Sequence, residues 1–120
     1  MIHYAMSRGM LVVDENVSSL ATLLRDRKFH TLVPPAGMPD DTIIDLHCAG
    51  RIIVTTNAKD FTELAPVYEF GIIEVTSTAM ADPARVAQQI SKEFSRRSLR
   101  HSSPFLLKIT PHSTTFQLLD

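Results

Sequence analysis

The chain has 120 residues, enough for one domain with a real hydrophobic core, and its 44% hydrophobic and 21% charged residues are ordinary for a globular protein. Its 12 Lys and Arg against 13 Asp and Glu give a net charge of −1, which argues against a dedicated nucleic-acid binder. The single cysteine, Cys48, excludes a disulfide framework. The sequence has no apolar run near the ~20 residues of a membrane span and no signal-peptide core. We therefore expect a cytoplasmic protein that does not enter a membrane.

The first part of the chain predicts a strand followed by a helix. Residues 1–9 show no clear period, and we interpret them as an extension or leader before a single domain over residues 10–120. Residues 10–13 form a short, unalternating apolar run that is typical of a strand buried on both faces. Apolar residues then recur at helical spacing, so a helix with Asn16 as its N-cap is predicted to end near Lys28.

The middle of the chain predicts two further strands separated by a loop and a helix. Residues 30–33 form the second strand, and the three prolines of residues 34–39 predict a loop. Asp40 or Asp41 is the expected N-cap of a helix of about ten residues. The apolar, β-branched run of residues 52–55 is then the third strand.

The last part of the chain completes an alternation of strands and helices. Residues 56–68 are polar and irregular, with about one helical turn, and residues 71–75 form the fourth strand. The clearest helix begins at Asp82, an N-cap followed by proline. Two strands at residues 104–109 and 114–119 close the chain. This order predicts an α/β fold, a three-layer sandwich with a mostly parallel central sheet.

Oxygen-bearing side chains follow the predicted strands at the ends where a site forms in this fold class. Asp14 follows the first strand, Asn57 and Asp60 follow the third, and Asp40 starts the helix after the proline-rich loop. Because the carboxyl ends of parallel strands meet at one edge, we expect these four side chains to converge, with Glu15 as a secondary candidate. Carboxylates repel one another unless a cation lies among them, and an all-oxygen ligand set suits Mg²⁺ or Mn²⁺.

Each of these residues also has a purely structural interpretation. Asp40 is an ordinary N-cap candidate, and Asp14, Asn57 and Asp60 are residue types that favour turns. Convergence from three separate segments weakens this interpretation without removing it.

Three short segments form a pattern at fixed spacing. The first is the LVVDEN run of residues 11–16, and the second is DDTII at residues 40–44, followed by GRIIVT at residues 50–55. The third is TTNAKDF at residues 55–61. This pattern resembles the PIN-like family of small prokaryotic proteins, relatives of the VapC-type toxin ribonucleases, over about residues 10–119.

The resemblance implies a PIN-like domain that cuts single-stranded RNA with Mg²⁺ or Mn²⁺ as the toxin of a toxin–antitoxin pair. Its implied partners are RNA, an antitoxin protein and a second copy of the chain in a homodimer. Asp14 matches the first metal ligand of the family and Asp40 the acid of the second motif. Asn57 stands where aspartate is often found, and Asp60 can compensate for the neutral amide.

Two alternatives to this ribonuclease remain open. No acid matches the helix acid found in longer PIN domains, which favours a catalytically weak or inactive module that binds a protein partner or RNA. The third hypothesis is a receiver-like signalling domain, because LVVDEN before an amphipathic helix also resembles the opening of that fold. The receiver ranks last, since Thr55 and Asn57 stand where its acceptor aspartate is needed.

Charge is distributed unevenly along the chain. Residues 10–60 hold seven acids, whereas residues 81–108 hold six Lys and Arg against two acids, an excess of four positive charges. Candidates for holding an RNA backbone are therefore Arg85, Lys92, Arg96, Arg97 and Arg100, although a solvated helix face explains them as well. The near-neutral total is thus compatible with RNA binding once a cation fills the acidic region.

Overall fold

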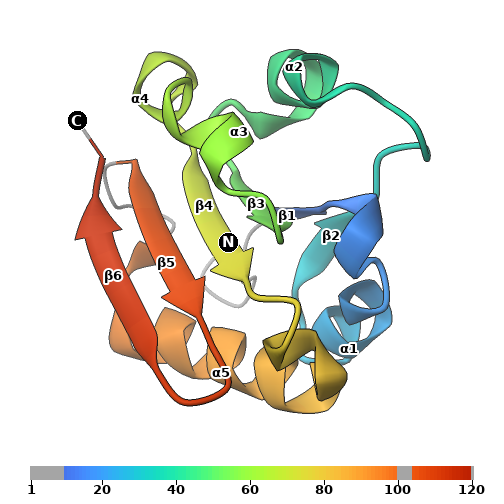
Figure 1. Cartoon of the computed structure of the whole chain (residues 1–120), viewed down its shortest axis with the longest axis vertical. Helices are drawn as coiled ribbons and strands as arrows, with labels where there is room; N and C mark the ends of the chain where they lie inside the picture. Colours follow the sequence, from blue (N-terminus) through green and yellow to red (C-terminus); the bar gives the residue numbers. More distant parts are fainter. Residues whose placement is uncertain (1–9, 100–103, 120) are drawn as a thin grey trace, which may run out of the picture.

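Six strands form one mixed sheet in the order β2-β1-β3-β4-β5-β6 (Figure 1). The computed structural model describes residues 10–99 and 104–119, so the predictions for residues 1–9 and for Arg100 lie outside the described residues. The strands are β1 (Met10–Val13), β2 (His30–Leu32), β3 (Ile52–Thr55), β4 (Gly71–Val75), β5 (Phe105–Ile109) and β6 (Thr114–Leu118). The first five pair in parallel and β6 pairs with β5 in antiparallel fashion, so the predicted α/β fold with a mostly parallel sheet is confirmed.

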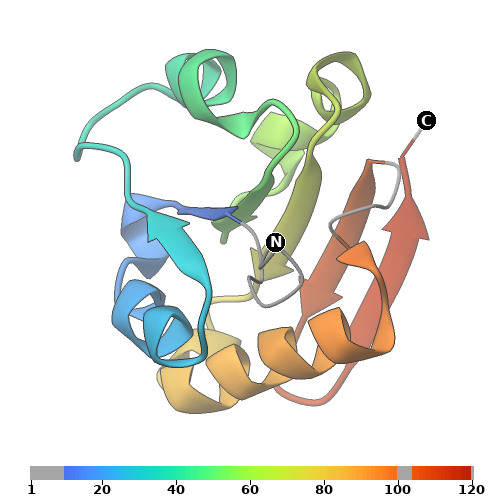
Figure 2. The same cartoon turned by 180° about the vertical axis from the view of Figure 1, so that it is seen from behind.

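Helices cover both faces of the sheet (Figures 1 and 2). One face carries α1 (Leu20–Asp26), the short turn η4 (Ala79–Ala81) and α5 (Pro83–Arg96). The other carries α2 (Asp40–Ile43), the π-helical turn η3 (Ile44–Cys48), α3 (Lys59–Thr62) and α4 (Ala65–Tyr68). Within the described ranges, no helix is long and apolar enough to cross a bilayer.

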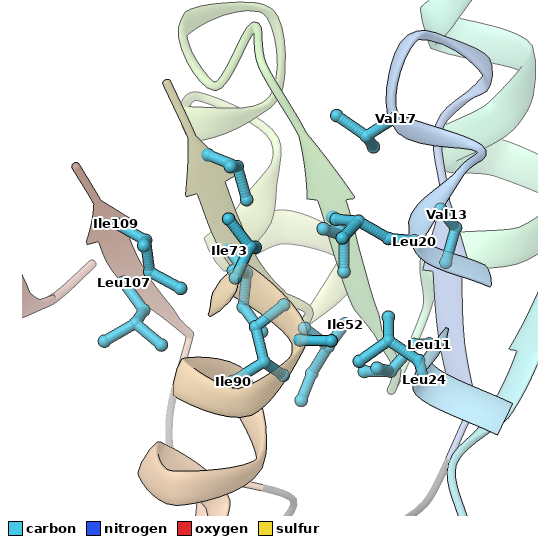
Figure 3. Close-up of a cluster of buried hydrophobic side chains, with 14 of the residues drawn as sticks. Leu11, Val13, Val17, Leu20, Leu24, Ile52, Ile73, Ile90, Leu107 and Ile109 are labelled. Atoms are coloured by element: carbon cyan, nitrogen blue, oxygen red, sulfur yellow. The ribbon is translucent and has the colours of Figure 1, made fainter. Parts of the chain in front are cut away.

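The strand residues divide between two hydrophobic clusters because successive side chains of a strand point to opposite faces. In β1, Leu11 and Val13 join the cluster beneath α1 and α5, where they pack with Leu20 and Ile90 (Figure 3). Val12 joins the cluster on the other face. The unbroken apolar runs of β1 and β3 therefore reflect burial on both faces, as their sequences predict.

The predicted start of the first helix is wrong. Asn16 is not an N-cap: Asp14 caps the 3₁₀ turn η2 (Glu15–Val17), and α1 begins only at Leu20. The helix then ends at Asp26, because Lys28 adopts a left-handed backbone with φ of 76° that cannot continue it. The predicted start at Asp82 is confirmed, and its carboxylate accepts a hydrogen bond from the backbone N–H of Arg85.

The second helix and the following polar segment also differ in detail from their predictions. Pro39 occupies the N-cap position, while Asp40 and Asp41 are the first two helical residues. The carboxylate of Asp41 accepts from the N–H of Thr42 at 2.8 Å. Residues 56–68, expected to contain one turn, form the two short helices α3 and α4.

Gly71 lies where the ring of Phe105 crosses the start of β4. A Cβ on Gly71 would stand 2.1 Å from Cε2 and 2.4 Å from Cζ of that ring, and Phe105 is itself buried. We therefore expect Gly71→Ala to lower the free energy of unfolding by about 1–3 kcal/mol, as overpacked cores do. Urea denaturation measures this loss.

The matched control combines Gly71→Ala with a smaller side chain at position 105. In a Phe105→Leu background the added methyl has room, so Gly71→Ala should cost clearly less there than in the wild-type background. Equal costs in both backgrounds would show that the ring contact is not the cause.

Candidate functional site

Asp14 is held firmly at the carboxyl end of β1. Its backbone N–H donates to Val54 O at 2.9 Å, which continues the pairing of β1 with β3. Its Oδ1 accepts from the N–H of Glu15 and its Oδ2 accepts from Thr55 Oγ1, both at 2.8 Å. Only 7% of Asp14 is exposed and Thr55 is fully buried, so this carboxylate has one fixed orientation.

Thr55 also links Asp14 to the segment that follows β3. Its Oγ1 accepts from the N–H of Asn57 at 3.1 Å while it donates to Asp14. The side-chain amide of Asn57 in turn donates to Oδ2 of Asp60, the second residue of α3. One chain of hydrogen bonds therefore connects the ends of β1 and β3 with the first turn of α3.

Asp40 brings the third segment to the same place. The pKa of its carboxyl is raised above 3.8 by burial, by a side-chain hydrogen bond with Asp60, and by the negative charges of Asp14, Asp60 and Asp41. A carboxyl responds in this way only to carboxylates close by. Contacts and charges thus relate Asp14, Asp40, Asn57 and Asp60, which lie at the ends of two strands and the starts of two helices.

Glu15 has a different task in the structure. Its Oε1 accepts from the N–H of Gly37 at 2.9 Å, and Gly37 adopts a φ of 84° that favours glycine. This bond ties the proline-rich loop before α2 to the turn after β1. Glu15 thus helps to place Asp40, because the loop leads directly into α2.

The donor set consists of oxygen atoms, the ligands that Mg²⁺ and Mn²⁺ prefer. Yet among residues 10–99 and 104–119 no group of three or more His, Cys, Asp or Glu side chains is arranged so that it could hold a metal ion. The negative charges of Asp14, Asp60 and Asp41 also favour the protonated form of Asp40. Loss of that proton and a small rearrangement would be needed before a cation is bound.

The basic residues predicted to hold RNA fall into two groups. Arg85 and Lys92 are exposed on α5. Arg96 and Arg97 instead bind the carboxylate of Glu93, at 3.1 Å and 2.9 Å. The guanidinium of Arg97 also lies 4.4 Å from the ring centre of Phe116, so these two arginines are fixed by the fold.

Glu93 and Thr55 are the residues that sequence reasoning missed. Glu93 is fully buried, and a signal was present, because it follows Val86 and Ile90 at the spacing of the inward stripe of α5. Thr55 ends β3, a position where a hydroxyl often bonds to nearby backbone groups. Its bond to Asp14 spans 41 positions, which no local pattern reveals. Cys48 packs in the core as expected, and burial raises the pKa of its thiol to about 12.

Comparisons with family models, with curated proteins and with solved structures found no match to this chain. The function of the protein therefore has to be inferred from the residues and contacts described above.

The raised pKa of Asp40 predicts a gain of stability when its charge is removed. The folded state holds the Asp40 proton more tightly than the unfolded state does, so wild-type stability falls as pH rises through the raised pKa and stays lowered at neutral pH. We expect Asp40→Asn to raise the free energy of unfolding at pH 7, by an amount that solvent screening keeps small. At a pH below 3.8, the ordinary pKa of the carboxyl, Asp40 is protonated in both the folded and the unfolded protein. The gain in stability from Asp40→Asn should then vanish.

Urea denaturation at pH 7 and near pH 3, with EDTA present, measures this difference. Asp26→Asn is the control, because Asp26 is an exposed acid at the end of α1. A less stable Asp40→Asn protein at pH 7 would contradict the repulsion between Asp40 and its acidic neighbours.

Proposed function

We propose that this protein is a Mg²⁺- or Mn²⁺-dependent endoribonuclease of the cytoplasm that cleaves single-stranded RNA, with a PIN-like, three-layer fold. The observation that supports this most is the raised pKa of Asp40 beside Asp14 and Asp60. The charges of Asp14 and Asp60 oppose ionisation of Asp40 at the edge of the sheet where ligands bind in α/β folds. A divalent cation is the ligand that would relieve their repulsion.

The residues that would hold the cation are Asp14, Asp40 and Asp60, with Asn57 as a neutral oxygen donor if its amide releases Asp60. When bound, such a cation activates water and offsets charge on a scissile phosphate. Asp14 suits the first position, because each of its oxygens has one hydrogen-bond donor and keeps room for another partner. Thr55 acts as a positioning residue, since it fixes Oδ2 of Asp14.

The biological setting follows from the resemblance to PIN-like toxins. On that basis we infer that the protein acts as the toxin of a toxin–antitoxin pair, with an antitoxin protein as partner and a homodimer as assembly. Growth arrest on expression, relieved by the product of a neighbouring gene, tests this role separately from the chemistry.

A cleavage assay on single-stranded RNA tests the enzyme activity. The wild type should cleave with Mn²⁺ or Mg²⁺ and stop with EDTA, and Asp14→Ala and Asp40→Ala should lose activity. Asp26→Ala is the matched control, and it should cleave like the wild type. Equal activity in all four proteins, or none in any of them, would overturn the proposal.

A second candidate is a PIN-like module without catalysis that binds RNA or a protein partner. The observation that favours it is the present use of the site: the Asn57 amide is bonded to Asp60, and the described residues offer no ready three-acid group. RNA binding without turnover, at any concentration of Mn²⁺, would select this candidate over the nuclease.

A further inference from the structure

A polar cleft of about 290 Å³ lies between α5 and the turn that joins β5 to β6. We call it the α5 cleft. One wall is formed by Arg85, Gln89, Glu93 and Arg96, and the other by residues 110 and 112–114 of the turn. β5 lies three strand positions from β1, roughly 14 Å at about 4.8 Å per strand, so the cleft is separate from the candidate site at Asp14.

In the wall that α5 contributes, the guanidinium of Arg96 is held in place by Glu93. Glu93 is fully buried, and its two oxygens already accept from Gln89 Nε2, Arg96 Nη1 and Arg97 Nε at 2.9 to 3.1 Å. The carboxylate is thus satisfied within the protein. It holds the guanidinium of Arg96, whose side chain is 59% exposed, at the cleft with donors to spare.

The charges around the cleft favour an anion. Among the residues that line the cleft, Arg85 and Arg96 against Glu93 leave a net charge of +1. Arg85 forms no ion pair with any residue that the structure describes, so its five N–H donors are available. The opposite wall adds the hydroxyls of Ser113 and Thr114. The Thr110 hydroxyl is used within the turn, where it accepts from the N–H groups of His112 and Ser113 and bonds to Ser113 Oγ at 2.8 Å.

The lining also indicates what the anion is attached to. A cleft of about 290 Å³ is near the lower end of small-ligand sites, about 300 Å³, and is larger than one phosphate group requires. Its described lining is charged, amide, hydroxyl or imidazole. Hydroxyl groups on a ligand would match these donors and acceptors.

We propose that the α5 cleft binds a phosphate group carried on a sugar. Arg85 and Arg96 face the phosphate oxygens, because a guanidinium fork matches two of them at once. Gln89 and the hydroxyls of Ser113 and Thr114 face the sugar. The site does not depend on cleavage at Asp14, and its failure would leave the proposed nuclease untouched.

The test is a titration of the full chain with ribose 5-phosphate, followed by calorimetry and by the backbone amide signals of residues 85–96 and 110–114. Ribose 5-phosphate should bind at millimolar concentration or below and shift these signals, whereas ribose should not. Arg85→Gln should weaken binding at least about tenfold, since a charge-assisted hydrogen bond is lost. Lys92→Gln, an equally exposed cation of α5 outside the cleft, should change it less than about twofold.

Two short RNAs, one with a 5′-phosphate and one without, distinguish the sources of the sugar phosphate. Weaker binding of both RNAs by Arg85→Gln assigns the cleft to the RNA backbone, and weaker binding of the phosphorylated RNA alone assigns it to a terminal phosphate. An effect on ribose 5-phosphate alone assigns the cleft to a free small molecule. The proposal is overturned if ribose 5-phosphate shifts no cleft signal, if ribose binds equally well, or if Arg85→Gln and Lys92→Gln weaken binding to the same extent.

Discussion

Replacing Asp14 with asparagine is expected to lower the rate of RNA cleavage by at least about 100-fold. The substitution keeps the size of the side chain but removes the charge of the one acid that two hydrogen bonds hold in place. Even residues that only orient a metal ligand typically change activity or affinity by about 10- to 100-fold, so loss of the ligand charge should cost more. Single-turnover cleavage at saturating Mn²⁺ measures the rate.

Thr55→Val gives the matched, milder change. It removes the hydroxyl that orients Asp14 without altering any charge, and we expect a loss of about 10- to 100-fold. If Asp14 is a positioned metal ligand, the cleavage rate should therefore fall in the order wild type, Thr55→Val, Asp14→Asn. A Thr55→Val protein that is well folded but as inactive as Asp14→Asn would contradict this order, and unchanged cleavage by Asp14→Asn would remove the metal-dependent mechanism.

Removing both arginines that bind Glu93 is expected to destabilise the fold more strongly than Gly71→Ala does. In Arg96→Met with Arg97→Met, the fully buried carboxylate keeps only the amide of Gln89 as a partner. A buried charge left without its counter-charge costs roughly 3–5 kcal/mol. The contact of Arg97 with the ring of Phe116 is lost as well. Chemical denaturation at pH 7 measures the free energy of unfolding.

The rescue variant identifies the cause. Adding Glu93→Gln to the double variant removes the unpaired charge and should restore most of the lost stability. Arg85→Met with Lys92→Met removes two exposed cations from the same helix and should change stability by no more than about 1 kcal/mol in total. If the triple variant is as unstable as the double variant, the carboxylate is not the source of the loss.

Much of the fold could be predicted because its signals are local. Buried parallel strands require apolar side chains on both faces, so Leu11, Val12 and Val13 mark β1 without further context. Likewise Asp82 before a proline marks the start of α5, because the cap bond and the fixed φ of proline act within one turn.

The boundaries of α1 and α2 depend on contacts that such patterns do not contain. Asn16 has the right side chain for an N-cap, but Asp14 takes that place through η2 while also bonding Thr55. The turn η3 widens to a π-helix between Ile44 and Cys48, both buried in the core. Both outcomes are decided by packing between segments distant in sequence.

The candidate site, like the fold, could be predicted only in part from the sequence. The residue types and the sheet edge could be predicted, because carboxyl ends of parallel strands meet at one edge. The influence of Asp60 on Asp40 and the use of Glu15 to hold Gly37 could not be predicted, since each relation joins residues about 20 positions apart. Arg96 and Arg97 are cationic as predicted, but a buried acid in their own helix decides where they point.

The acidic site joins elements of different local stability, because α2 and α3 have only four residues each whereas β1 and β3 lie in the sheet. Asp40 and Asp60 lie in the first turns of helices far too short to persist alone, whereas Asp14 is fixed to the central strands β1 and β3. Local opening of α2 or α3 can therefore separate the carboxylates while the sheet stays intact. Amide hydrogen exchange should accordingly be faster in these helices than in β1 and β3. A bound cation would join the two regions into one unit, so that exchange in α2 and α3 slows toward that of the sheet.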